Sequence, residues 1–452
     1  NIPNWIYRDF SGVLPKPIAA IFNSSFRDAY IPSIWKAADV VPLPKVNPPQ
    51  THKKDLRPIS LTPNISKVQE SFVHRWVLDV LRTIMDKKQF GAIRGTCTTH
   101  ALITMLHKWL KGTDNNKDKN FVQIVLLDYT KVFDHVDPNI LIDKLARMNV
   151  PDPLLRWIEC FLSHRKQRVK IGSVFSEWIE VWGTVPQGTL LGVLCFIAMI
   201  NDLTTECDTI KYVDDTTIFH ITNDPKDKSL QSAVDTAITW SQSNSMKINA
   251  SKTKEILVNY MKTPLDVPHI IVEDQSVDRV KDFKLLGVYF NDKLNWETHV
   301  NHIYKKACQR IHFISCLKRI KLSPQDLVKV YTSLVRPITE YACQLWHPGL
   351  TGGQIDILET IQERVLKIIY PCLEYNDALN ESKLDKLYDR REKLSERLFV
   401  DAQQTHHKLF PLMPPLREFR SNVRDSYPFS IPLCHTSRYK NTFINHGLSR
   451  KW

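Results

Sequence analysis

The stretch that decides the fold is Lys211-Tyr-Val-Asp214-Asp215-Thr-Thr-Ile-Phe219, in which two adjacent acids separate two short apolar runs. Runs rich in β-branched and aromatic residues predict strands, and an Asp pair between them predicts a tight turn. Adjacent carboxylates repel each other unless a hard divalent cation neutralises them. The motif therefore indicates either a solvated hairpin or a metal-binding turn.

A further acid follows the most apolar strand-like segment upstream. Residues 121–127 read Phe-Val-Gln-Ile-Val-Leu-Leu, and Asp128 comes directly after them. A run of this kind predicts a buried strand with its acid at the exposed end. An isolated Asp in this position is more often a helix cap or turn residue than a metal ligand, so its role depends on the rest of the chain.

Several other blocks occur in a fixed order around these acids. They are Trp35-Lys-Ala-Ala-Asp-Val-Val-Pro-Leu-Pro-Lys45, Arg57-Pro-Ile-Ser-Leu61, Gln89-Phe-Gly91, Pro186-Gln-Gly188, Asn249-Ala-Ser-Lys-Thr253, Leu285-Leu-Gly-Val288 and Glu340-Tyr-Ala342. With the Asp128 and Asp214-Asp215 blocks, they resemble the reverse transcriptase of non-LTR (LINE-type) retrotransposons, the C-terminal part of an endonuclease/reverse-transcriptase polyprotein. The resemblance runs from about Ile31 to near the C-terminus.

This resemblance implies an RNA-directed DNA polymerase that adds dNTPs to a primer 3′-hydroxyl on an RNA template. The reaction is nucleotidyl transfer assisted by two Mg²⁺ ions, with Mn²⁺ as a possible substitute. Asp128 and Asp214 are the candidate direct ligands, and Asp215 is a supporting ligand. Lys252 matches a lysine proposed as the general acid for the pyrophosphate leaving group, although an exposed lysine is the alternative.

The resemblance also implies substrate-binding residues, each with a structural alternative. Lys45 and Arg57 would clamp the triphosphate, or form surface ion pairs. The predicted aromatic gate against ribose is Phe133, which could instead be a core residue. The remaining candidates are the nucleotide-supporting Gln187 and Gly188, whose alternative is a plain turn, and the primer grip Leu286, Gly287 and Val288, whose alternative is an ordinary strand.

The composition suits a polyanionic partner without proving one. The formal charge of the 452 residues is +13, and a basic surface attracts nucleic acid. Two clusters are predicted to contact phosphates, or else to be solvated faces: residues 165–170, and a set comprising Lys305, Lys306, Arg310, Lys318, Arg319 and Lys321. The nine cysteines include no CxxC pair, which argues against a zinc knuckle. Cys308 and Cys316 are predicted to be buried thiols.

The predicted fold class is α+β, a right-hand polymerase with an antiparallel sheet in its palm. The predicted domains are an N-terminal extension of the fingers (1–30), fingers and palm (31–295), a helical thumb (296–371) and a C-terminal extension of unknown role (372–452). Thr62-Pro63 predicts a helix start, with Ile65, Val68, Phe72, Trp76 and Val80 on the buried face. Further helices are expected over 98–110, 138–148, 153–162 and 229–243, and from 298 onward. Strands are expected over 38–44 and 284–290, and the rings of Tyr341, Trp346 and Trp157 are expected in the core.

The expected partners are an RNA template, a DNA primer, their hybrid and dNTPs, with no membrane. No targeting segment is visible, so the expected location is the nucleus and cytoplasm. The family's endonuclease is absent from the sequence, and the initial Asn suggests a piece of a longer reading frame. Departures from the family pattern include Val132, Val213 and Leu191-Gly-Val193. Two alternatives therefore stay open: a catalytically decayed remnant that only binds nucleic acid, and a relative of group II intron maturases or telomerase.

Overall fold

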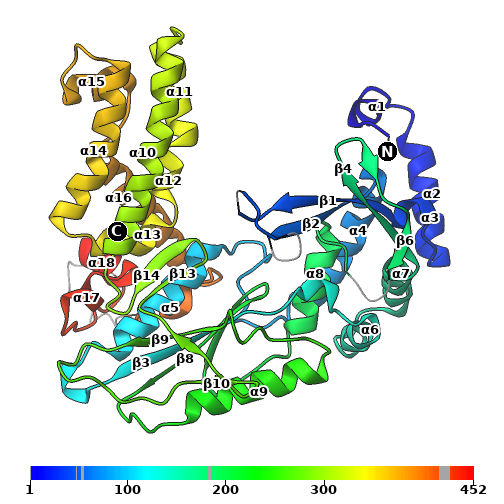
Figure 1. Cartoon of the computed structure of the whole chain (residues 1–452), viewed down its shortest axis with the longest axis horizontal. Helices are drawn as coiled ribbons and strands as arrows, with labels where there is room; N and C mark the ends of the chain where they lie inside the picture. Colours follow the sequence, from blue (N-terminus) through cyan, green and yellow to red (C-terminus); the bar gives the residue numbers. More distant parts are fainter. Residues whose placement is uncertain (1, 47, 52–54, 182–184, 417–427) are drawn as a thin grey trace.

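In the computed structural model the chain has the shape of a U (Figure 1). The structure describes residues 2–46, 48–51, 55–181, 185–416 and 428–452. An N-terminal lobe and a helical lobe rise from a base that contains the central sheet (Figure 1). Helices and sheets are both prominent, so the predicted α+β class is confirmed.

The N-terminal lobe is built on a small mixed sheet. β1 pairs antiparallel with β2 and parallel with β4, and the register places Arg57 opposite Leu43. The predicted strand over 38–44 is therefore confirmed. The elements of this lobe are α1 (Asn4–Asp9), α2 (Pro15–Asp28), α3 (Ser33–Lys36), β1 (Ala37–Pro44), β2 (Leu56–Leu61), α4 (Asn64–Leu81), β4 (Arg165–Ile171), β5 (Val174–Phe175) and β6 (Ile179–Val181).

α4 buries a different face from the one predicted. The helix begins at Asn64, so Pro63 occupies the cap position, and the buried Thr62 hydroxyl has no hydrogen-bond partner within the described chain. Phe72 and Trp76 remain 37% and 39% exposed, because their rings pack against α2 rather than the core. The residues that α4 buries are Ser66, Gln69, Glu70, Val73, Val77 and Leu81.

The central sheet has the strand order β12-β9-β3-β8-β7. Alternate residues of β3 pack on opposite faces: Val122 and Ile124 join one hydrophobic cluster, and Val125 and Leu127 join the other. Helices cover both faces, which explains why this strand reads as a continuous apolar run. The strands are β3 (Phe121–Leu127), β7 (Asp208–Tyr212), β8 (Asp215–Thr222), β9 (Lys254–Val258) and β12 (Asp278–Arg279).

Four of the helices around the sheet agree with the sequence predictions, and the helix over 190–200 was not predicted. The helices are α5 (Thr98–Gly112), α6 (Pro138–Arg147), α7 (Asp152–Leu162), α8 (Leu190–Ile200) and α9 (Ser229–Ser243). Short 3₁₀ turns cover Asn116–Asp118 (η1) and Val132–Asp134 (η2), and a two-stranded ribbon comprises β10 (Ile271–Val272) and β11 (Gln275–Ser276). No helix in the described ranges is long and apolar enough to cross a bilayer.

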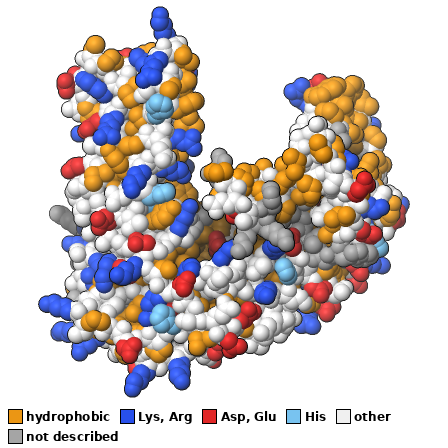
Figure 2. All heavy atoms as spheres, in the orientation of Figure 1, with side chains coloured by type: hydrophobic (Ala, Val, Ile, Leu, Met, Phe, Trp, Pro, Cys, Tyr) orange, Lys and Arg blue, Asp and Glu red, His pale blue; other side chains and the backbone are white. Residues whose placement is uncertain are grey.

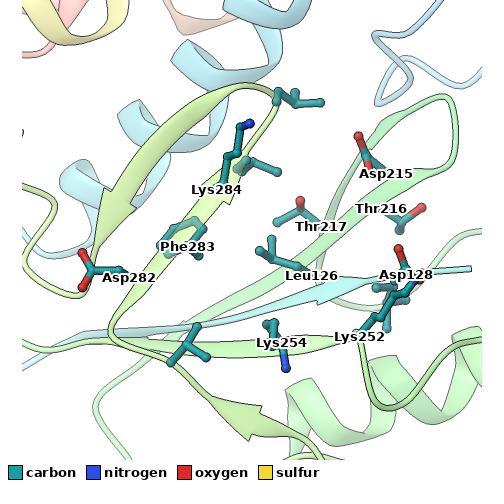
Figure 3. Close-up of a pocket in the computed structure, with 14 residues that line it drawn as sticks. Leu126, Asp128, Asp215, Thr216, Thr217, Lys252, Lys254, Asp282, Phe283 and Lys284 are labelled. Atoms are coloured by element: carbon teal, nitrogen blue, oxygen red, sulfur yellow. The ribbon is translucent and has the colours of Figure 1, made fainter. Parts of the chain in front are cut away.

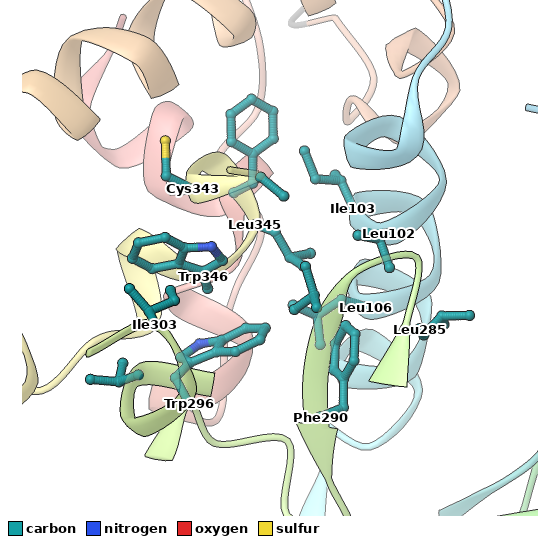
Figure 4. Packing of buried hydrophobic residues seen from close by; sticks show 14 of the residues in the cluster. Leu102, Ile103, Leu106, Leu285, Phe290, Trp296, Ile303, Cys343, Leu345 and Trp346 are labelled. Carbon is teal, nitrogen blue, oxygen red and sulfur yellow. The ribbon is translucent and has the colours of Figure 1, made fainter. Parts of the chain in front are cut away.

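A second hairpin links the sheet to the helical lobe. The single strand predicted over 284–290 is wrong, because β13 (Asp282–Leu285) and β14 (Val288–Asn291) pair antiparallel around Leu286-Gly287. Both turn residues have positive φ, 46° and 86°, which is the backbone that tight two-residue hairpin turns require. Figure 4 shows Phe290 of this hairpin beside the ring of Trp296, with Leu285 farther from the rings of Trp296 and Trp346, and all four residues belong to one hydrophobic cluster.

The helical lobe and C-terminal segment complete the chain. Trp346 and Trp157 are buried as predicted, whereas Tyr341 is 42% exposed, and Cys308 and Cys316 are only half-buried on the lobe surface. The helices are α10 (Glu297–Arg319), α11 (Pro324–Leu334), α12 (Arg336–Glu340), α13 (Cys343–Trp346), α14 (Gly352–Ile369), α15 (Tyr375–Ser382), α16 (Leu387–Ala402), α17 (Ser437–Lys440) and α18 (Phe443–Arg450), with 3₁₀ turns at His347–Gly349 (η3) and Phe410–Leu412 (η4).

Candidate active site

The central sheet brings the three predicted acids to one end of two adjacent strands. Asp128 follows the last paired residue of β3, where Leu127 faces Thr216 of β8. Asp214 lies in the turn between β7 and β8, and Asp215 begins β8 opposite Tyr212. Antiparallel pairing thus places residues that are nearly ninety positions apart at the same edge of the sheet.

Two of these acids, Asp128 and Asp215, border a pocket between the central sheet and the β13–β14 hairpin, whereas Asp214 lies outside its lining. Figure 3 shows Asp128, Asp215 and Lys252 on the sheet side, with Phe283 and Lys284 on the hairpin. The pocket has a volume of about 290 Å³. Its lining comprises Leu126, Leu127, Asp128, Asp215, Thr216, Thr217, Lys252, Lys254, Val280, Asp282, Phe283, Lys284, Leu285 and Leu286.

Burial and mutual repulsion disfavour the charged form of the acids. Asp215 is exposed by area, yet burial of its carboxyl within the pocket, followed by the charges of Asp214 and Asp128, raises its pKa to about 6. Burial also raises the pKa of Asp214, and the charge of Asp128 adds to this effect. The pKa of Asp128 is raised by burial as well. Three carboxylates in this state favour a bound cation.

The donor set suits a hard divalent metal ion. Oδ2 of Asp128 is buried and accepts no hydrogen bond from the described residues, which leaves an oxygen donor of the kind that Mg²⁺ and Mn²⁺ prefer. No three His, Cys, Asp or Glu side chains converge on one point in the described parts of the chain. The oxygen donors of the acids are therefore of the right kind for such an ion, but the described residues do not form a ready-made cage around one point.

Three predicted cations face the acids. Nζ of Lys252 lies 3.8 Å from Oδ2 of Asp128, and its side chain is 62% exposed. The charges of Lys252 and Lys45 partly offset the rise in the pKa of Asp128, and Arg57 does the same for Asp214. Lys45 and Arg57 belong to the N-terminal lobe and are exposed, and their charges act on the carboxylates at the end of the central sheet.

The predicted nucleotide-supporting turn lies against β2. The backbone N–H of Ser60 donates to the carbonyl oxygen of Gln187 at 3.0 Å. Gly188 is exposed with φ +101°, a conformation that favours glycine. Because Ser60 belongs to the same strand as Arg57, the turn and the arginine occupy neighbouring positions on one surface.

Phe133 is half-buried at the start of the segment after Asp128. It lies in η2, and its ring centroid is 5.6 Å from that of Phe196 in α8. Its carbonyl oxygen accepts a hydrogen bond from the N–H of Val185 at 2.9 Å. One side of the ring therefore packs on Phe196 and part of the residue stays accessible. This agrees both with the predicted aromatic gate and with the alternative of a core residue.

The predicted primer grip is the turn of the second hairpin. Leu286 is half-buried, Gly287 is exposed and Val288 is buried. The hydroxyl of Tyr341 donates to the carbonyl oxygen of Leu286 at 2.7 Å, and it also bonds the Thr98 hydroxyl at 3.0 Å. Tyr341 was missed as a site residue, since only the tertiary fold brings the helical lobe to this turn.

The two predicted basic clusters differ in the structure. Arg165 is 5% exposed and donates to the carbonyl oxygen of Phe161, so its inclusion in a phosphate-binding surface is wrong. Arg168 pairs with Asp39 at 2.7 Å and lies over the rings of Phe175 and Trp178. In the second cluster, on α10 and the turn after it, the exposed members are Lys305, Lys306, Arg310, Arg319 and Lys321, and Figure 2 shows Lys and Arg side chains along the helical lobe.

Two pocket residues on the sheet and hairpin were also missed. Lys254 and Lys284 both line the pocket, and Lys254 pairs with Asp278 at 2.8 Å. Lys254 begins β9, two residues after Lys252, which lies in the turn before the strand. Because strand alternation does not extend into that turn, the sequence pattern gave no signal for Lys254.

Comparison with known proteins identifies the relatives of the chain. The family model described as reverse transcriptase (RNA-dependent DNA polymerase) matches residues 43–290, more than half of the chain. The chain is 26% identical over 430 residues to the probable RNA-directed DNA polymerase from transposon X-element of Drosophila melanogaster, covering 90% of this chain and 46% of that protein. It is also 26% identical to the RNA-directed DNA polymerase from mobile element jockey of the same species, covering 87% and 44%.

The chain thus spans about half the length of the curated relatives it matches. Among solved structures, telomerase from Candida tropicalis in complex with a TWJ fragment of telomeric RNA aligns with a TM-score of 0.44 and 11% identity, over 96% of this chain and 63% of that one. Apo telomerase from the same organism aligns with a TM-score of 0.43 and 12% identity, over 88% and 68%. The resemblance expected from the sequence is confirmed by the family and transposon matches.

Proposed function

The chain belongs to the reverse transcriptase family, and from this premise we propose that it is the RNA-directed DNA polymerase of a non-LTR retrotransposon. It adds dNTPs to a primer 3′-hydroxyl on an RNA template. The observation that supports this proposal is the group of three carboxylates at the end of β3 and β8, on which the charges of Lys45 and Arg57 of the N-terminal lobe act.

Asp128 and Asp214 are the proposed metal ligands, with Asp215 in support. When bound, two Mg²⁺ ions supply charge neutralisation at the attacking and leaving oxygens of an in-line displacement, and Mn²⁺ is the expected substitute. The orphaned Oδ2 of Asp128 and the raised pKa of Asp215 support this assignment. The carboxylates themselves orient the reacting groups and keep negative charge beside them.

The cations handle the triphosphate and the leaving group. Arg57 presents a planar fork that suits bidentate contact with phosphate oxygens, and Lys45 contributes a point charge. Lys252 gives a proton to the departing pyrophosphate, a role worth about 10²–10⁴-fold in rate, and its distance of 3.8 Å from Asp128 supports this assignment. Phe133 borders the sugar and disfavours a 2′-hydroxyl, and Gln187 and Gly188 support the base pair.

The two arms of the U hold the nucleic acid. The β13–β14 turn, residues 286–288, positions the primer end, and the exposed cations of α10 contact backbone phosphates. We propose fingers and palm over 31–295, a thumb over 296–371 and a C-terminal extension over 372–452. An endonuclease supplied by another part of the polyprotein would create the primer.

Primer extension tests the proposal. The oligo(dT) primer on a poly(rA) template is incubated with Mg²⁺, dTTP and either the wild-type chain or the Asp214→Asn variant, and the extension by the two proteins is compared. The substitution keeps the shape of the side chain and removes its charge. We expect extension that the variant loses. A folded wild-type chain that binds the hybrid without extending it would instead establish the decayed, binding-only alternative. Equal extension by both proteins would disprove the assignment of Asp214.

A further inference from the structure

The turn that carries Asp214 and Asp215 has an unfavourable backbone. Val213, directly before the acids, has φ 58°. This left-handed region is rare for a β-branched residue and persists where the surrounding structure imposes it. The element that imposes it is a segment over a hundred residues upstream, Gln89-Phe90-Gly91.

Gln89 bonds directly to this turn. Its side chain is 1% exposed, and its Oε1 accepts hydrogen bonds from the backbone N–H of Val213 at 3.0 Å and of Gly91 at 2.8 Å. Gly91 packs against the same turn, because a Cβ added to it would lie 2.4 Å from the nitrogen of Val213. One buried amide oxygen and one missing side chain therefore determine where the turn lies.

The segment that carries Gln89 is itself fixed on two sides. The N–H of Phe90 donates to the carbonyl oxygen of Lys211 at 2.8 Å, and the N–H of Lys211 donates to the carbonyl oxygen of Lys88 at 2.9 Å. The segment therefore runs along β7. From the C-terminal region, Nζ of Lys408 donates to the carbonyl oxygen of Gln89 at 3.1 Å. The same ammonium lies 4.7 Å from the ring centroid of Phe90.

We propose that Gln89 is a positioning residue for polymerisation, which holds the Val213 turn so that Asp214 and Asp215 stay beside Asp128 at one edge of the central sheet, and that Lys408 braces Gln89 from the C-terminal extension. The proposal rests on the proposed function, because it concerns the geometry of that site. It also gives the extension after residue 402 a role in catalysis without any contact with substrate.

The test compares Gln89→Met with Gln89→Glu. Methionine keeps the length and burial of the side chain but accepts neither hydrogen bond, whereas glutamate retains an oxygen for both in either protonation state. Gln69→Met is the matched control, since Gln69 is also 1% exposed and lies in α4, away from the turn. Two readouts are measured: single-turnover extension of oligo(dT) on poly(rA) over a range of dTTP concentrations, and hydrogen exchange of the Val213 amide.

We expect Gln89→Met to lower the extension rate about 10- to 100-fold, as misplacement by about 1 Å does, with an apparent dTTP affinity within about twofold of wild type. Its Val213 amide should exchange about tenfold faster, because a buried hydrogen bond is lost. Gln89→Glu should restore the rate to within about threefold of wild type, and Gln69→Met should change neither readout.

Three outcomes would overturn the proposal: wild-type rate and exchange in Gln89→Met, an equal loss of rate in Gln69→Met, or no rescue by glutamate. If circular dichroism shows that Gln89→Met does not fold, Gln89→Asn is used instead. Its side chain is one methylene shorter, so its oxygen lies farther from the two N–H groups, and this variant must show the same loss of extension rate. If the wild-type chain extends no primer, the proposed function fails, while the exchange rates of Val213 still decide whether Gln89 holds the turn.

Discussion

Replacing Asp215 with asparagine should make the metal-free protein more stable at neutral pH. The pKa of Asp215 is raised from 3.8 to about 6 in the folded chain, so the native state holds this proton more tightly than the unfolded state. Ionised Asp215 therefore destabilises the folded wild-type protein. This loss of unfolding free energy is absent below pH 3.8, grows as the pH rises toward 6 and is complete above it.

The size of the effect follows from that interval. The span from 3.8 to about 6 corresponds to about 3 kcal/mol of unfolding free energy. Because Asp215 is exposed by area, solvent screening reduces the expected gain of Asp215→Asn to about 1 kcal/mol at pH 7.5. At pH 3.5 the two proteins should be equally stable.

Urea unfolding at both pH values measures this difference, first with EDTA and then with Mg²⁺. Added Mg²⁺ should stabilise the wild type more than the variant, because binding to the native state adds to its stability. Asp326→Asn is a control of opposite sign, since Ser323 and Lys329 lower the pKa of Asp326, and the variant should be less stable at pH 7.5. The reasoning is refuted if Asp215→Asn is no more stable than wild type at pH 7.5, or gains as much at pH 3.5.

Three further substitutions test other parts of the site. Arg57→Gln removes a charge that lowers the pKa of Asp214, so the acidic limb of the pH–rate profile for extension should move to higher pH. The dTTP affinity should fall about tenfold, the loss of one charge-assisted hydrogen bond. Extension rates measured over a range of pH and of dTTP concentration give both values. Tyr341→Phe removes the hydrogen bond to Leu286 and should weaken use of the primer end about threefold to tenfold, measured as the primer concentration at half-maximal rate. Phe133→Val should raise rUTP relative to dTTP incorporation about tenfold or more, read from single-nucleotide extension.

Each of these expectations has a clear contrary result. An unchanged pH profile in the Arg57 variant would separate that residue from the acids. Normal primer use by the Tyr341 variant would make its hydrogen bond purely structural. Unchanged sugar selection by the Phe133 variant would leave that ring as a core residue packed on Phe196.

The sequence by itself determined the elements whose signal is local. The apolar run over 121–127 is β3, and the periodic segment over 229–243 is α9, with the predicted bounds in both cases. The positions of Asp128 and of the Asp214–Asp215 turn at strand ends also follow from their own neighbours in the chain, whereas their role as candidate metal ligands came from the resemblance to reverse transcriptases. Such features depend on side-chain periodicity and turn chemistry within a few residues, which the sequence contains in full.

Only the tertiary structure decided which partner each surface meets. The side of α4 that is buried depends on distant segments, and the contacts of Tyr341 with Leu286 and of Gln89 with Val213 join residues that lie far apart in the chain. No period within one element carries that information, because a buried amide or hydroxyl satisfies its hydrogen bonds with whichever backbone group the fold brings beside it. The sequence therefore determined the acids, and the fold determined how they are held.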